Sequence, residues 1–179
     1  MLSVATLLDG VIREGRALAD RPVVLVWPLV FFLAGRVFRR VSWLYVIFVL
    51  PGTVLHEGAH WLSGLLLGAR PARFSVMPKF ERDGICLGHV GFSRLRWWNA
   101  LPVGLAPLIL LPVGVALILH GGQERLLHPG MVARGYLAIQ CLGGCCPSST
   151  DLGHAGHSAL IYSVLGLTLW FAGRVSGFC

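Results

Sequence analysis

Long apolar stretches separated by short polar ones dominate the pattern along the chain. Five stretches carry few charges, and they cover residues 22–38, 41–69, 100–119, 131–146 and 158–173. A helix needs roughly 20 apolar residues to cross the hydrocarbon core of a bilayer. The pattern therefore predicts an all-α polytopic membrane protein, with about five transmembrane or re-entrant helices.

Composition points the same way. Of the 179 residues, 55% are hydrophobic and 13% are charged, whereas charged residues make up about 25% of a typical soluble domain. We expect a single membrane-embedded domain over residues 1–179, in a multi-pass protein of the bacterial cytoplasmic membrane. Residues 1–21 are expected to form an amphipathic helix at the membrane surface, with an apolar side made of Leu7, Leu8, Val11, Ile12 and Leu18.

A polar stretch over residues 70–98 interrupts the apolar pattern. The segments "RFSVM" and "ICLGHV" within it predict two short strands, paired as a β-hairpin. The net charge of +7 arises from arginines scattered between the apolar stretches, so no nucleic-acid partner is expected. The distribution of basic residues between alternate loops favours a cytoplasmic N-terminus.

The sequence "HEGAH", residues 56–60, places three ionisable side chains inside an apolar stretch. Residues i and i+4 share one face of a helix, so the imidazoles of His56 and His60 can converge on one metal ion. Glu57 projects in another direction and can accept a proton from a metal-bound water. The alternative is structural, with the histidines bonded to neighbouring helices and Glu57 neutral.

A third protein ligand is needed for a catalytic zinc site. Asp151 in "CPSSTDLGHAGH" is the only acidic residue after Glu124, and it lies between two apolar stretches. His154 and His157 are its rivals, since they lie in the same polar segment. Zinc is the expected metal for two histidines and a carboxylate, although iron shares this ligand set.

The segments "LPGTVLHEGAHWLSGLLLGA" and "PSSTD" together resemble the site-2 protease class of intramembrane zinc metalloproteases. The resemblance implies that His56, His60 and Asp151 bind zinc and that Glu57 is the catalytic base. It also implies a β-hairpin after the HExxH helix, and a membrane protein substrate cleaved in or near a transmembrane segment. The late signature of the class, Asn-x-x-Pro leading into Leu-Asp-Gly, is not present as a unit.

Two other functions stay open at this stage. The absence of the full late signature and of a recognition domain fits a non-catalytic scaffold that binds metal and a partner protein. A small transporter could instead use His56, Glu57 and His60 as a proton relay. The five cysteines show no disulfide spacing and are assigned no chemistry.

Overall fold

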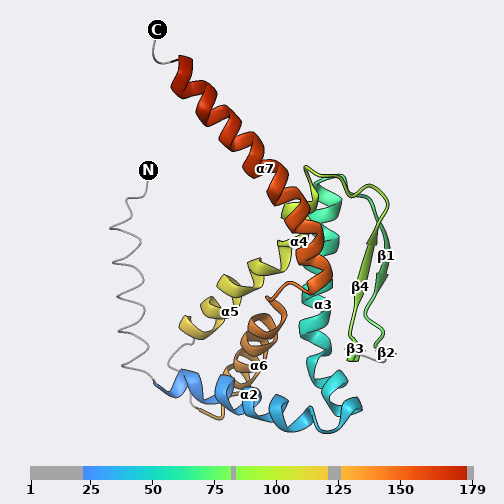
Figure 1. The fold of residues 1–179 in the computed structure, drawn as a ribbon. Coiled ribbons are helices and arrows are strands. Elements are labelled where there is room, and N and C mark those ends of the chain that lie inside the picture. Colours follow the sequence, from blue (N-terminus) through green and yellow to red (C-terminus); the bar gives the residue numbers. More distant parts are fainter. Residues whose placement is uncertain (1–21, 82–83, 121–125, 177–179) are drawn as a thin grey trace. The chain divides into compact units, whose positions relative to one another are not determined.

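The computed structural model describes residues 22–81, 84–120 and 126–176. The surface helix predicted over residues 1–21 lies outside these residues. Within them the chain is mainly helical, as the apolar pattern predicts (Figure 1). The helical elements are η1 (Pro22–Leu25), α2 (Val26–Phe38), α3 (Ser42–Leu66), α4 (Ala100–Gly104), η2 (Ala106–Ile109), α5 (Leu110–Leu119), α6 (Pro129–Gly144) and α7 (Ser149–Ser176).

The prediction of a polytopic membrane protein is wrong, and so is the predicted location in the cytoplasmic membrane. Among the described residues, no helix combines the length and the apolar character needed to cross a bilayer. Helices α2, α5 and α6 have 13, 10 and 16 residues, fewer than the roughly 20 required. The longer helices α3 and α7 include the polar segments 56–60 and 149–158. The prediction relied on the apolar content of the chain, which does not show where each helix begins and ends.

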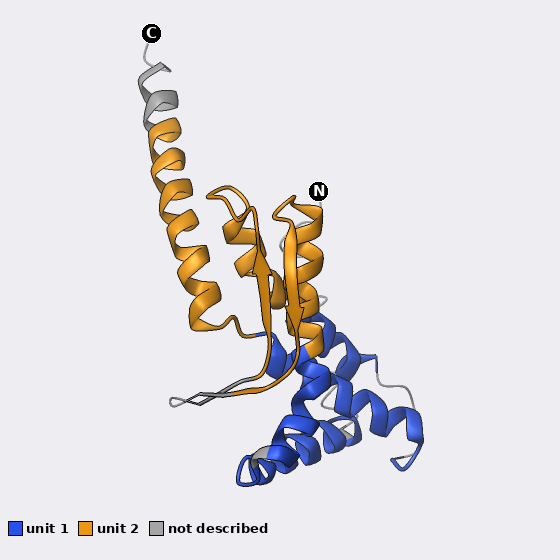
Figure 2. Ribbon diagram, turned by 90° about the vertical axis from the view of Figure 1, so that its right-hand side faces the viewer, with its two compact units in different colours: residues 1–53, 110–145 blue, residues 54–109, 146–179 orange. Residues whose placement is uncertain are grey.

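The chain forms two compact units, coloured separately in Figure 2. Unit 1 consists of residues 1–53 and 110–145, and unit 2 consists of residues 54–109 and 146–179. Helix α3 therefore contributes its first half to unit 1 and its second half to unit 2. In unit 1, Leu110, Cys141 and Cys145 form a buried apolar cluster, and the thiol of Cys145 donates to the carbonyl of Leu142 at 3.1 Å.

Side chains of α6 bind the backbone of α3 beside its internal proline, within unit 1. Pro51 lies inside α3, and the next N–H, that of Gly52, donates to Oε1 of Gln140 at 3.1 Å. The carbonyl of Phe48, one turn earlier, accepts from Nε2 of Gln140 at 3.0 Å and from the hydroxyl of Tyr136 at 2.7 Å. The Gln140 amide thus matches one donor and one acceptor of the α3 backbone.

Unit 2 contains the predicted hairpin, which the structure confirms. Strand β1 (Pro71–Ser75) pairs antiparallel with β4 (His89–Phe92), with a bulge between Pro71 and Arg73. Further along, β2 (Lys79–Glu81) pairs antiparallel with β3 (Gly84–Cys86). The four strands form two antiparallel pairs, β1 with β4 and β2 with β3, which follow α3 in the chain (Figure 1).

The turn from α3 into this hairpin has a local cause. Gly68 adopts a φ of +67°, a conformation that glycine enters without steric cost. The N–H of Ala69 donates to the carbonyl of Gly64, and the N–H of Gly68 donates to that of Leu65. This pair of bonds is the Schellman arrangement that ends a helix. It ends α3 shortly after the HEGAH segment and starts the hairpin.

Candidate metal centre

His56 and His60 lie one turn apart on the part of α3 that belongs to unit 2. Their Nε2 atoms are 3.2 Å apart, and their rings meet edge to face at 78°. His60 is 4% exposed, so it is shielded from bulk water. The i, i+4 spacing therefore brings the two nitrogens together, as the sequence predicts.

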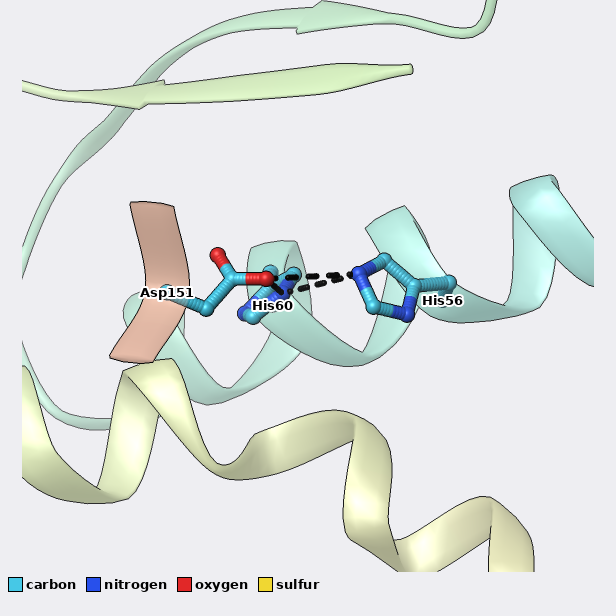
Figure 3. Close-up of side chains that lie close together, drawn as sticks. All are labelled: His56, His60 and Asp151. Atoms are coloured by element: carbon cyan, nitrogen blue, oxygen red, sulfur yellow. Dashed lines mark hydrogen bonds and ion pairs between the residues drawn. The ribbon is translucent and has the colours of Figure 1, made fainter. Parts of the chain in front are cut away.

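Asp151 is brought to the same point from the first turn of α7. Its Oδ2 lies 3.6 Å from Nε2 of His56 and 3.3 Å from Nε2 of His60 (Figure 3). The structure thus brings the predicted third ligand together with the histidine pair. Among the described residues, these three side chains form the group of His, Cys, Asp or Glu that could hold a metal ion. His154 and His157 lie further along α7 with exposed side chains and are not part of it.

The distances within this group fit a small tetrahedral metal. A zinc ion with bonds of about 2.0–2.1 Å places its ligand atoms about 3.3 Å apart. The three separations here are 3.2, 3.3 and 3.6 Å. Two imidazoles and one carboxylate also form a common set of protein ligands in catalytic zinc sites. The donor set and its spacing therefore suit such an ion.

The orientation of His60 is fixed by the backbone of α4. Nδ1 of His60 lies 2.8 Å from the carbonyl oxygen of Val103, and a carbonyl can only accept. Nδ1 therefore carries a proton, and in the neutral imidazole the lone pair of Nε2 faces His56 and Asp151. The residue four positions after Val103 is Pro107, which has no N–H to donate to this carbonyl, so the carbonyl can accept from His60.

Helix α4 also receives the first turn of α7. A Cβ at Gly104 would lie 2.7 Å from the backbone oxygen of Asp151 and 3.2 Å from Cβ of Ala155. Any side chain at position 104 would therefore displace α7 from α4. The adjacent residues Val103 and Gly104 thus set the positions of His60 from α3 and Asp151 from α7.

The converging atoms have more lone pairs than protons. When both imidazoles are neutral, Nε2 of His60 presents a lone pair, the carboxylate of Asp151 only accepts, and Nε2 of His56 can carry one proton. In that state the three adjacent atoms share at most one donor hydrogen. Such an arrangement is stabilised by a cation placed among them, either an added proton on one of the histidines or a metal ion.

The acidity of Asp151 suits a ligand. Burial by itself raises the pKa of its carboxyl, but hydrogen bonds with His56, His60 and Ser148 outweigh burial and hold the pKa well below its ordinary value. The carboxylate is therefore ionised across the physiological pH range. Metal ligands must be deprotonated, so no proton on Asp151 competes with a cation near neutral pH.

Glu57 lies beside the ligands but is not one of the clustered group. It is 8% exposed, and burial raises the pKa of its carboxyl, an effect that His56 and His60 oppose. Its carboxyl packs against Gly88, which follows β3. A Cβ at Gly88 would lie 2.6 Å from Cγ and 2.7 Å from Oε1 of Glu57. The hairpin therefore fits closely over this carboxyl only because residue 88 lacks a side chain.

Sequence reasoning did not identify four contributors to this centre, namely Val103, Gly104, Pro107 and Ser148. Pro107, four residues after Val103, indicates that the Val103 carbonyl lacks its usual helical donor. The neighbouring sequence does not indicate that His60 would donate to that carbonyl. The Ser-x-x-Asp spacing at Ser148 is a recognisable helix-start pattern and was the one available signal. Comparison with protein-family models, characterised proteins and solved structures finds no match to the chain.

Proposed function

We propose that this protein is a zinc-dependent peptide hydrolase in which His56, His60 and Asp151 bind the metal and Glu57 moves the proton. The observation that carries the proposal is the position of Asp151, whose Oδ2 lies 3.3–3.6 Å from both Nε2 atoms of the HExxH pair. HExxH alone occurs by chance, but a half-buried carboxylate brought to it from a distant segment completes a possible zinc ligand set.

Zinc bound by these residues would acidify a water molecule and polarise the carbonyl of the bond to be cleaved. The choice of zinc rests on the two imidazoles, the single carboxylate and the ligand separations near 3.3 Å. Iron accepts the same ligand types, so the experiment below identifies the metal directly.

Glu57 has the properties of a general base. Its neighbour His56 and the next-turn His60 both act on its pKa, so its carboxyl lies within electrostatic reach of the metal ligands. Burial raises that pKa towards neutrality, which makes the carboxylate a better proton acceptor at physiological pH. In hydrolysis it would take the proton of the attacking water and pass it to the departing amine nitrogen.

The assignment of a peptide as substrate rests on the resemblance of "HEGAH" and the late "STD" to the site-2 protease class. The hairpin that follows the HExxH helix agrees with that resemblance. We propose peptide-bond hydrolysis without a commitment to a particular protein substrate.

The test compares the wild type with Glu57→Gln and His60→Ala. Metal content is measured by elemental analysis, and cleavage is measured with a mixture of fluorogenic peptides. We expect Glu57→Gln to retain zinc and to lose about 10²- to 10⁴-fold in turnover, the usual contribution of a general base. His60→Ala should lose both zinc and activity.

Three outcomes would contradict the proposal. Equal turnover by the wild type and Glu57→Gln would remove Glu57 from the reaction. Stoichiometric zinc with no turnover by the wild type would instead favour the non-catalytic, metal-binding scaffold. Stoichiometric iron in the purified protein would show that the assignment of zinc is wrong.

A further inference from the structure

We propose that Ser148 is a positioning residue, which holds the ligand oxygen of Asp151 in place through the capping box that begins α7. The inference rests on the metal centre of the proposed function. It concerns how that centre is built rather than whether it cleaves peptides.

Ser148 and Asp151 are joined by reciprocal hydrogen bonds. The N–H of Ser148 donates to Oδ2 of Asp151 at 2.7 Å, and its hydroxyl donates to the same oxygen at 2.6 Å. The N–H of Asp151 lies 3.3 Å from Oγ of Ser148. A serine before the first helical residue and an acidic residue three positions later form a capping box. Here aspartate takes the place usually held by glutamate or glutamine.

The oxygen held by Ser148 is the one that faces the histidines. Oδ2 of Asp151 lies 3.3 Å from Nε2 of His60 and also accepts both hydrogen bonds from Ser148. Hydrogen bonds to a carboxylate at 2.6–2.7 Å are in the range of strong, charge-assisted ones. They fix both side-chain torsions of Asp151, so metal binding would cost little additional ordering of this ligand.

The residues around the capping box fix where in the chain α7 begins. Pro147 cannot continue a helix, and it disfavours helical geometry at the residue before it, so α6 and α7 remain separate. Gly104 admits the first turn of α7, because a side chain there would collide with the backbone of Asp151. The start of α7 is thus fixed by its cap and by its contact with α4, and Asp151 follows at the position where its carboxylate meets the histidines.

A helix cap and a ligand-positioning role make different predictions. A cap alone stabilises the metal-free fold and leaves the affinity for metal unchanged. A positioning role lowers the affinity for metal when the hydrogen bond is removed, even in a variant whose fold is intact. Partners of metal ligands in other proteins contribute about 10- to 100-fold to metal affinity.

The experiment measures zinc affinity by competition with a chromophoric chelator, and thermal unfolding of the metal-free protein. The variants are Ser148→Ala, Ser148→Gly and Ser148→Thr, with Ser149→Ala as the matched control. Ser149 is exposed, lies in the same first turn and makes no side-chain hydrogen bond in the described structure. Glycine is tolerated at a helix N-cap far better than alanine, so Ser148→Gly removes the hydroxyl with little loss of fold.

We expect Ser148→Ala and Ser148→Gly to weaken zinc binding by about 10-fold or more, while Ser148→Thr stays near the wild type. Ser149→Ala should leave the affinity unchanged. Wild-type affinity in Ser148→Gly, or an equal loss in Ser149→Ala, would overturn the inference.

The inference and the proposed hydrolase activity fail separately. Zinc affinity is measured without any substrate, so a protein that binds zinc but cleaves nothing still tests Ser148. If the wild type binds no zinc, both proposals are wrong.

Discussion

Helix α3 takes part in two polar clusters that differ in chemistry. In unit 1, Gln140 and Tyr136 bind the α3 backbone at Gly52 and Phe48, and each polar atom there is matched with an opposite partner. In unit 2, one turn further along α3, His56, His60 and Asp151 present lone pairs to one another with few hydrogens between them.

The two clusters show how polar groups that only stabilise the fold differ from polar groups that can bind a ligand. Buried polar groups are normally paired, because an unpaired one costs free energy of folding. The Gln140 cluster satisfies this rule internally and needs nothing further. The His56–His60–Asp151 cluster brings acceptors close together, and a cation among them would supply the matching positive charge. An excess of acceptors at short range is thus the feature that favours cation binding at this site.

The largest expected effect comes from removing a ligand in unit 2. His60→Ala should weaken zinc binding by more than about 100-fold, because a lost ligand costs more than a lost partner of a ligand. Zinc at 100 times its dissociation constant should stabilise the wild type by about 2.7 kcal/mol and should leave His60→Ala unaffected. Zinc titration and thermal unfolding measure the two effects.

His154→Ala is the control, since it removes an exposed histidine of α7 outside the cluster. We expect it to bind zinc as the wild type does. If His60→Ala and His154→Ala lost zinc equally, His154 would also belong to the metal centre. The centre would then not be limited to His56, His60 and Asp151.

A moderate effect is expected from the paired cluster in unit 1. Gln140→Met keeps the size of the side chain but leaves the N–H of Gly52 without its acceptor. A buried unpaired group costs about 1–3 kcal/mol, so the free energy of unfolding should fall by that amount. Chemical denaturation measures the change.

Zinc affinity in Gln140→Met should stay within about threefold of the wild type, as is usual for independent positions. A tenfold loss of zinc affinity would show instead that the Gln140 cluster contributes to the metal centre.

The smallest effect concerns the hydroxyl of Tyr136. Burial raises the pKa of Tyr136 in the folded protein, so the hydroxyl stays protonated and donates to Phe48. A folded-state pKa above the unfolded value near 10 gives a stabilisation that is complete below pH 10 and is lost as the pH rises through the folded pKa. Tyr136→Phe should lower stability by about 0.5–1.5 kcal/mol at pH 7.

Above pH 10, the stability of Tyr136→Phe should fall less steeply than that of the wild type, as measured by denaturation at several pH values. Tyr162→Phe is the matched comparison, because its hydroxyl donates to Trp98 in unit 2. Identical pH profiles for the wild type and Tyr136→Phe would show that this hydroxyl does not titrate with folding.

The sequence by itself determined the features that depend on neighbours along the chain. Four-residue spacing brings His56 and His60 together on any helix. The segments "RFSVM" and "ICLGHV" within residues 70–98 predict the two strands of the hairpin. These outcomes follow from local geometry, which the order of residues fixes.

Only the tertiary structure decided which distant residues meet. It selected Asp151 over His154 and His157, because the cap at Ser148 and the contact with Gly104 fix the start of α7. It also placed the Val103 carbonyl beside His60. Within residues 22–81, 84–120 and 126–176, it showed no helix with the length and apolar character of a membrane span. Composition and periodicity show which structure each single segment prefers. Whether side chains from distant segments meet depends on how those segments pack together, which neighbouring residues in the sequence do not determine.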